Sequence, residues 1–190
     1  MALLSPTEAT DTELVQRIID GDHQAFAVLF EKYRLMVYRY CVLMVNQKDV
    51  AEDVYQESFL ALFEHCSRGQ MIKNVRGFLM TVARRRCLNL IRNTKYKVPL
   101  TSHHLEEMAT AGDFEDTIDL ESHIRQALAR IPVQYREAFV FFEVEGYSYE
   151  EIAEFMEVSF NVVKNRIYRA KKVLQELLEP VWETTEKTEE

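Results

Sequence analysis

The residues of this sequence best suited to chemistry are cations, and the chemistry they indicate is neutralisation of phosphate. The segment VARRRCLNLIRNTKYK, residues 82–97, contains six lysines or arginines and no acid, although the 190-residue chain has a formal net charge of −8. A second window, residues 161–173, contains five cations and no acid. Local basic patches are the electrostatic mark of a nucleic-acid binder. The two windows predict two contacts with nucleic acid, against the alternative of two solvated helix faces.

A catalytic or metal-binding reading finds little support. The segment SHHLEE brings together His103, His104, Glu106 and Glu107, which would suit a metal-dependent hydrolase. Adjacent histidines in a segment without periodicity are more typical of solvated polar residues, and the zinc-helix spacing H-E-x-x-H does not occur. We therefore expect no catalytic residue, no metal and no cofactor, and hence no enzyme.

The cysteines and the absence of targeting signals indicate the compartment. Cys41, Cys66 and Cys87 are widely spaced and odd in number, which favours reduced thiols over a disulfide framework or a zinc site. The start of the chain has no signal-peptide pattern, and no apolar run is long enough to span a membrane. We expect a cytoplasmic protein without membrane insertion.

Both basic windows fall in segments with helical periodicity. Five glycines and four prolines provide few turns, which favours an all-α fold. Four helices are predicted over residues 11–97, and helical spacing returns over residues 118–180. Residues 98–117 have no sustained period and indicate a flexible linker. We expect two small helical domains joined by this linker, with an N-terminal tail (1–10) and an acidic tail (181–190).

The helix of the first window has two faces. At about 100° per residue, its core side carries Leu79, Ala83, Cys87, Leu90 and Ile91. The outward and flanking positions combine cations that neutralise phosphates with rings that stack on unpaired bases: Phe78, Arg84, Arg85, Asn89, Arg92, Lys95 and Tyr96. Alternatively, the two rings pack against a neighbouring helix. Arg86 is expected beside the core stripe, where it would snorkel or pair with an acid.

The second window belongs to a predicted helix-turn-helix, SYEEIAEFMEVSFNVVKNRIYRAKKVL. Ser148 and Glu151 form a capping-box pattern, and Ser159 is a candidate cap for the second helix. Outward positions on that helix carry side chains that can read base edges: Asn161, Lys164, Asn165, Tyr168, Arg169 and Lys172. Arg166 and Lys171 flank this face and suit phosphate contacts. The alternative is a three-helix bundle that binds protein.

The motifs together resemble a known family. The blocks AFAVLFEKYR, DVAEDVYQESFLALF and VRGFLMTVARRRCLNLIR, followed by the helix-turn-helix, are similar over about residues 13–178 to bacterial sigma factors of the extracytoplasmic-function group of the sigma-70 family. The resemblance implies that the first domain binds the clamp helices of the largest subunit of core RNA polymerase and recognises and melts the minus-ten element. It implies that the second domain sits on the β flap and reads the minus-thirty-five element, and that an anti-sigma factor restrains the protein.

The resemblance also assigns a role to the segment EDVYQESF. In sigma factors this acidic and amide-rich segment meets the clamp helices, which implies polymerase contacts here from Glu52, Asp53, Gln56, Glu57 and Phe59. We expect Phe59 on the exposed side of its helix, where exposed aromatic residues make binding hot spots. The alternative is ordinary packing of this ring.

Three positions depart from the family pattern, and one rival function remains. Phe78 stands where members often have tryptophan, and Asn161–Val162 where they often have Gly-Thr; members also often have asparagine near Arg85. The rival is a stand-alone helix-turn-helix regulator, which would bind duplex operator DNA without polymerase and would not need the EDVYQESF segment.

Overall fold

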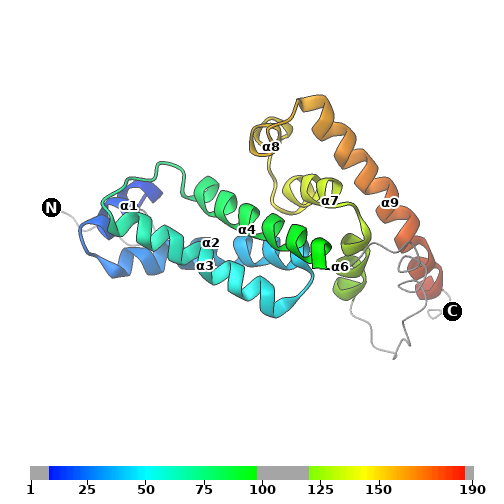
Figure 1. Cartoon of the computed structure of the whole chain (residues 1–190), viewed down its shortest axis with the longest axis horizontal. Coiled ribbons are helices and arrows are strands. Elements are labelled where there is room, and N and C mark those ends of the chain that lie inside the picture. Colours follow the sequence, from blue (N-terminus) through cyan, green and yellow to red (C-terminus); the bar gives the residue numbers. More distant parts are fainter. Residues whose placement is uncertain (1–8, 98–119, 187–190) are drawn as a thin grey trace. The chain divides into compact units, whose positions relative to one another are not determined.

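The structure is a computed structural model that describes residues 9–97 and 120–186 (Figure 1). Every regular element in these two ranges is helical, which confirms the all-α prediction. The chain divides into two compact units, Met1–Asn89 and Leu90–Glu190. The predicted linker, residues 98–117, lies outside the described residues, as do residues 1–8 and 187–190 of the two predicted tails.

Four helices form the first part of the chain: α1 (Asp11–Ile19), α2 (His23–Val45), α3 (Lys48–Ser67) and α4 (Val75–Lys97). Helix α2 packs against both α1 and α3. Its start is fixed by Asp22, whose carboxylate accepts a hydrogen bond from the Gln24 N–H at 2.9 Å. Asn46 ends α2 in the left-handed conformation, with φ of 55°, and the chain then reverses into α3.

Polar contacts join α1 to α2. Thr10 and Glu13 form a capping box at the start of α1. From the first turn, Asp11 accepts hydrogen bonds from Lys32 Nζ, at 2.6 Å, and from the Tyr33 hydroxyl. Burial, followed by the hydrogen bond to Asp11, raises the pKa of Tyr33. The hydrogen bond to the same carboxylate raises the pKa of Lys32.

A capping contact sets the start of α4, the helix that carries the first basic window. The side chain of Asn74 accepts a hydrogen bond from the Gly77 N–H at 2.8 Å. A Cβ atom at Gly77 would lie 2.7 Å from Asn74 Nδ2, so the absence of a side chain there leaves room for the cap. The cap defines where the basic helix begins, and hence which of its residues face the core.

The three thiols of the chain lie in the core of this first part. Cys41, Cys66 and Cys87 are buried free cysteines, as their spacing favoured. A hydrogen bond with the Cys87 thiol, together with burial, raises the pKa of Cys41. Burial raises the pKa of Cys66. Cys41 and Cys66 are therefore held as thiols away from water.

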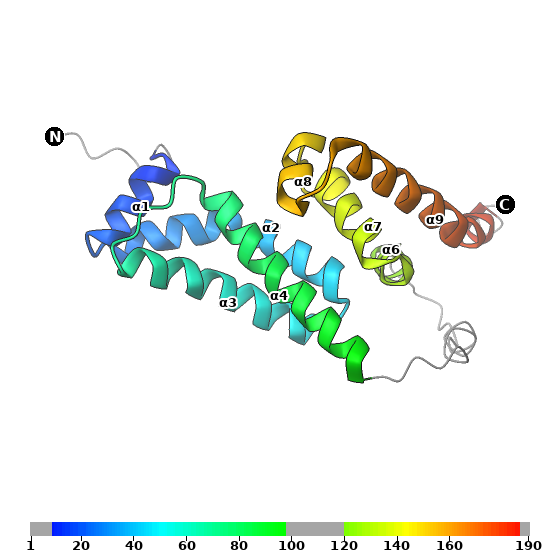
Figure 2. The same cartoon turned by 45° about the horizontal axis from the view of Figure 1, so that its top comes forward.

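The second part contains α6 (Leu120–Arg130), α7 (Val133–Phe139), the π-helical turn η1 (Val140–Val144), α8 (Tyr149–Met156) and α9 (Phe160–Glu186). Helix α9 packs against α6, α7 and α8, and α8 lies beside its N-terminal end (Figures 1 and 2). Helix α9 continues past Pro180, where we expected helical structure to end. A proline removes one backbone hydrogen bond, which does not terminate this helix.

Helices α8 and α9 form the predicted helix-turn-helix. Ser148 and Glu151 make the predicted capping box at the start of α8. Glu157 ends α8 in the left-handed conformation, with φ of 54°. The Ser159 carbonyl accepts hydrogen bonds from the N–H groups of Val162 and Val163 and so starts α9. The residues of α9 that face inward are buried: Val163, Ile167, Ala170 and Leu174.

Candidate nucleic-acid and protein interfaces

The basic helix α4 has the two faces that its period predicts. Leu79, Ala83 and Cys87 are fully buried and form its core side. Arg85 and Asn89 are exposed on the other side. Leu90, expected in the core, is 38% exposed, so the buried stripe ends about one turn earlier than predicted.

The remaining predicted contacts of α4 lie in different environments. Arg84 is half-buried and Arg92 is exposed. Phe78 is half-buried, and its ring packs against that of His65 on α3 with centroids 5.1 Å apart. Lys95 and Tyr96 belong to the last turn of the helix, and their side chains lie outside the described residues.

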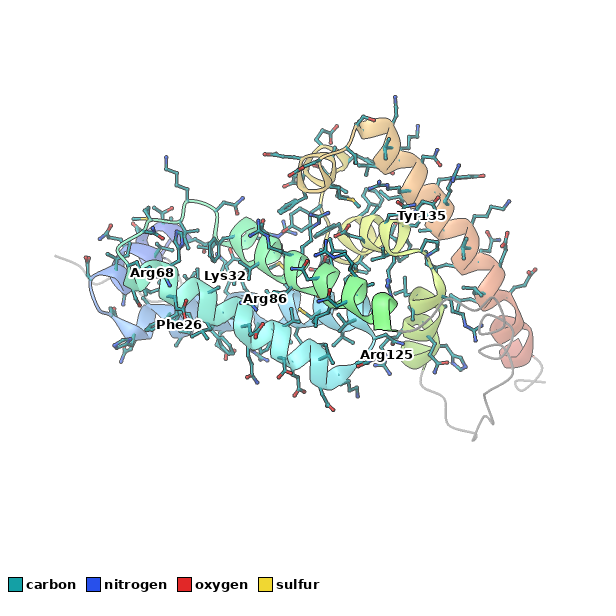
Figure 3. All side chains as sticks on the ribbon, in the orientation of Figure 1. Phe26, Lys32, Arg68, Arg86, Arg125 and Tyr135 are labelled. Carbon is teal, nitrogen blue, oxygen red and sulfur yellow. The ribbon has the colours of Figure 1, made fainter. Side chains whose placement is uncertain are left out.

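Arg86 points away from the exposed stripe. Its guanidinium donates a hydrogen bond to the Glu57 carboxylate on α3, and the two side chains are 40% and 50% exposed (Figure 3). This pairing confirms the expectation that Arg86 lies beside the core stripe and meets an acid. It also brings together the basic helix and the acidic surface of α3.

The acidic surface of α3 consists of exposed polar side chains around one apolar side chain. Glu52, Asp53, Gln56 and Glu57 are all exposed. Leu60 is 55% exposed and lies one turn beyond Gln56 and Glu57 on the same side of the helix. Sequence reasoning missed Leu60. Its position three and four residues after these polar side chains was the available signal.

The prediction that Phe59 is an exposed contact is wrong. This side chain is 3% exposed and lies among aromatic rings, with centroids 4.8 Å from Phe30 and 5.4 Å from Tyr55. On a helix, Phe59 and Leu60 point in directions about 100° apart. Helix α2 supplies rings that cover Phe59, and the exposed side of α3 is therefore the side of Leu60. We retain the four polar residues as candidates and replace Phe59 with Leu60.

The recognition face of α9 is exposed along its first turns. All side chains predicted to face outward are exposed: Asn161, Lys164, Asn165, Tyr168, Arg169 and Lys172. Tyr168, at 69%, is the most exposed of the large hydrophobic side chains in the described part of the chain. Arg166 is half-buried, with its Nη1 3.9 Å from the sulfur of Met156 on α8.

Two cations of α9 are held by neighbouring elements. Lys171 Nζ forms an ion pair with Glu143 Oε1 at 2.6 Å, and this carboxylate raises the pKa of Lys171. Arg169 Nη1 donates a hydrogen bond to the Tyr135 hydroxyl on α7 at 2.9 Å. Sequence reasoning predicted neither partner, because both are distant from α9 in the chain.

The described residues contain no grouping of three or more histidines, cysteines or acids that could hold a metal ion. His103 and His104, with Glu106 and Glu107, lie outside these residues. None of the described helices is long and apolar enough to cross a bilayer.

Family models match both parts of the chain. The model of sigma-70 region 2 matches residues 29–96, which include α3 and most of α4. The model of sigma-70 region 4 matches residues 123–174, which include α7, α8 and the first half of α9.

Curated relatives are similar over almost their whole length. RNA polymerase sigma factor CarQ of Myxococcus xanthus is 31% identical over 169 residues, covering 86% of this chain and 95% of the relative. RNA polymerase sigma-H factor of Pseudomonas aeruginosa is 27% identical over 193 residues, covering 92% of this chain and 97% of the relative. The relatives also include proteins named as extracytoplasmic-function sigma factors, such as SigW of Bacillus subtilis, at 23% identity over 176 residues, 86% of this chain and 94% of that protein.

Two solved structures share the fold. One is CnrH in complex with the cytosolic domain of CnrY, with a TM-score of 0.63 and 20% identity, covering 90% of this chain and 97% of that chain. The other is RpoE in complex with the anti-sigma factor NepR from Bartonella quintana, with a TM-score of 0.61 and 22% identity, covering 81% of this chain and 96% of that chain.

Proposed function

The chain belongs to the extracytoplasmic-function group of the sigma-70 family, and from this premise we propose how its surfaces divide the work of promoter recognition. It is a sigma factor: it binds core RNA polymerase and directs promoter-specific initiation of transcription, and it is not itself an enzyme. The interpretation as a stand-alone operator-binding regulator is thereby set aside. Three helices of the chain, α3, α4 and α9, carry the residues that we assign to these contacts.

The first assignment concerns α4, residues of which recognise the minus-ten element and help to open it. The exposed cations Arg85 and Arg92 suit the phosphates of a separated strand, and Asn89 lies with them on the exposed side. Arg84, Phe78, Lys95 and Tyr96 complete the proposed surface. Phe78 has one side packed on His65, so only part of its ring can stack on a base.

The second assignment concerns the acidic surface of α3, which binds the clamp helices of the polymerase's largest subunit. Its support is the combination of four exposed polar side chains with the exposed Leu60. An apolar anchor surrounded by polar groups has the anatomy of a binding hot spot. Acidic residues gathered on α3 and basic residues gathered on α4 explain how a chain of net charge −8 engages both protein and DNA.

The third assignment concerns α9, which reads the minus-thirty-five element while its domain sits on the β flap. Asn161, Lys164, Asn165 and Arg169 lie on the first turns, where a recognition helix meets base edges. The remaining members of the proposed surface are Arg166, Tyr168, Lys171 and Lys172. Lys172 suits a phosphate contact because it is exposed beyond these turns.

Regulation by a protein inhibitor is a further part of the proposal. Two structures that share this fold were solved with a bound partner, the cytosolic domain of CnrY in one and the anti-sigma factor NepR in the other. We expect an anti-sigma factor to hold this chain inactive in the same general way. The protein acts in the cytoplasm, where RNA polymerase is found.

The observation that carries the proposal is the order of the two matched regions, with the acidic α3 and basic α4 in the first and the helix-turn-helix in the second. The test is capture of core RNA polymerase by the purified chain, followed by run-off transcription with a pool of genomic fragments. Polymerase should be retained, and a small set of fragments should yield transcripts only when the chain is present. Binding to duplex DNA without any affinity for core polymerase would contradict the proposal.

A further inference from the structure

A tyrosine outside the helix-turn-helix holds one of the cations of the recognition helix. The Tyr135 side chain extends from α7 towards α9, two helices that pack together (Figure 3). Arg169 Nη1 donates a hydrogen bond to the tyrosine hydroxyl at 2.9 Å. The guanidinium carbon lies 5.8 Å from the centroid of the same ring, within cation–π range. One residue therefore restrains Arg169 through both its hydroxyl and its ring.

This restraint leaves the charge of Arg169 intact. Lys171, two residues along α9, is paired with the Glu143 carboxylate at 2.6 Å, so an opposite charge lies beside its ammonium group. Tyr135 is neutral, and it fixes the position of Arg169 without cancelling the attraction of the guanidinium for DNA. Among the described residues, Arg169 uses one hydrogen-bond donor of its guanidinium, and an arginine has five. Enough donors remain for a bidentate contact with a guanine edge.

Restraint before binding has a definite thermodynamic effect. A free arginine side chain on a helix surface loses rotamer entropy when it is fixed on DNA. A side chain already fixed in the free protein loses less, so a larger part of the contact free energy contributes to affinity and selectivity. Neither Lys164 nor Lys172, both exposed on the same helix, has a hydrogen-bond or ion-pair partner within the described residues.

We propose that Tyr135 is a positioning residue for promoter recognition, which holds the Arg169 guanidinium in the orientation that reads a base pair of the upstream element. The inference rests on the proposed function of α9 and adds to it a residue that lies on α7. Tyr135 does not itself contact DNA. Its effect is on selectivity at the base pair read by Arg169.

The experiment compares Tyr135→Phe, Arg169→Ala and the double variant, each as full-length chain in holoenzyme. Binding to a set of promoters with single base-pair changes in the upstream element is measured at several salt concentrations. Arg169→Ala should reduce discrimination at one or two base pairs by about 5-fold or more. Tyr135→Phe keeps the ring but removes the hydroxyl, and should reduce discrimination at the same base pairs by a smaller factor. The salt dependence of DNA binding by the Tyr135→Phe variant should match that of the unmodified protein, because this substitution removes no charge.

The double variant and a control separate positioning from a general loss of structure. In the absence of Arg169, removal of the Tyr135 hydroxyl should have no further effect on discrimination. Tyr149→Phe removes the hydroxyl of another half-buried tyrosine, whose ring packs on Phe142 and Phe160, and should leave discrimination unchanged. Thermal midpoints of Tyr135→Phe and Tyr149→Phe that equal the midpoint of the unmodified protein would show that neither substitution perturbs the fold.

The inference and the proposed function fail in different ways. If Tyr135→Phe leaves discrimination as it is, or alters it at base pairs other than those affected by Arg169→Ala, Tyr135 does not position Arg169. If Lys164→Ala and Asn165→Ala impair promoter binding while the Tyr135 and Arg169 variants do not, only the positioning role is overturned. If none of these variants changes DNA binding, the assignment of α9 to the upstream element is overturned as well.

Discussion

Arg86 on α4 donates a hydrogen bond to Glu57 on α3, so a cation of the basic segment is paired with an acid of the proposed polymerase surface. Both side chains are about half exposed, and such a pair contributes about 1 kcal/mol or less to stability. The main consequence of the pair is that the Arg86 side chain points towards α3. Arg85, the preceding residue, is exposed on the other side of α4, so two consecutive arginines serve different surfaces.

This division predicts different effects of two neighbouring substitutions on strand opening. Arg85→Ala combined with Arg92→Ala should impair formation of the open promoter complex and leave affinity for core polymerase unchanged. Arg86→Ala is the matched control, and should affect opening much less because its guanidinium faces α3. Permanganate footprints of the opened region provide the measurement. Unchanged footprints in the double variant would remove α4 from the melting surface.

The acidic surface of α3 should lose affinity for core polymerase when its apolar centre is truncated. Leu60→Ala combined with Gln56→Ala should weaken binding at least 10-fold, about 1.4 kcal/mol, the range expected for a hot spot. Leu35→Ala removes the same atoms from another exposed leucine, 64% exposed on α2, and should have little effect. Affinity is measured by competition for core polymerase. Equal affinities for the two variants would refute the assignment.

Phe59→Ala should act on stability rather than on binding. Truncation of a buried phenylalanine costs about 3–5 kcal/mol, because the rings of Phe30 and Tyr55 lose a partner. In urea denaturation of the full chain, the unit that contains Phe59 should unfold at a lower urea concentration than in the unmodified protein. A variant of normal stability with weakened polymerase binding would restore Phe59 as a contact.

Base-reading and phosphate contacts on α9 should separate by their salt dependence. Asn165→Ala should cost about 1–3 kcal/mol and relax selection at one base pair. Lys172→Ala should weaken binding to all sequences alike and lower the salt slope by about one unit. Titrations of holoenzyme on promoter variants at several salt concentrations test both statements. A uniform loss in both variants would contradict this separation.

Alkaline pH should weaken the connection between α1 and α2. Lys32 and Tyr33 have pKa values raised above their usual 10.5 and 10.0. A raised pKa in the folded chain gives stabilisation that is complete below the usual value and is lost as the pH rises through the folded value. The free energy of unfolding should therefore fall above about pH 10. Asp11→Asn should make this decline shallower, whereas Glu64→Gln, in a separate exposed pair with Arg68, should leave it unchanged.

The end of α8 offers a stabilising substitution. Glu157 is exposed and adopts a left-handed conformation that favours glycine. Glu157→Gly should stabilise the second unit by about 0.5–1 kcal/mol, since the strain exceeds the entropy lost on ordering glycine. Ala153→Gly, inside α8, should destabilise by about 1 kcal/mol. Thermal unfolding followed by circular dichroism compares them, and a lower midpoint for Glu157→Gly would contradict the expectation.

Local sequence patterns predicted the features of this fold that depend on helical period. The buried side of α4 and the capping box of α8 follow from residues within one or two turns of each other, so the sequence was sufficient there. The exposed side of α3 was not predictable in the same way. Phe59 and Leu60 are both apolar, and only the rings supplied by α2 decide which of them is covered.

Contacts between distant residues explain the remaining differences. Tyr135 and Arg169 are 34 positions apart, and no periodicity links them. The partners of Arg86 and Lys171 are likewise on other elements. The helical period of the sequence identified the exposed cations. The packing of the helices determines which of these cations are held in place by a partner.

The three buried thiols make the protein suitable for measuring local unfolding by cysteine labelling. All cysteines of the chain belong to the first unit, and each is covered by the packing of its helices. A thiol-specific reagent can reach them only when this packing opens, so the rate of labelling measures opening of that unit alone. Binding of polymerase or of an inhibitor to the first unit should slow the labelling of these cysteines, whereas a ligand confined to the second unit should leave the labelling rate unchanged.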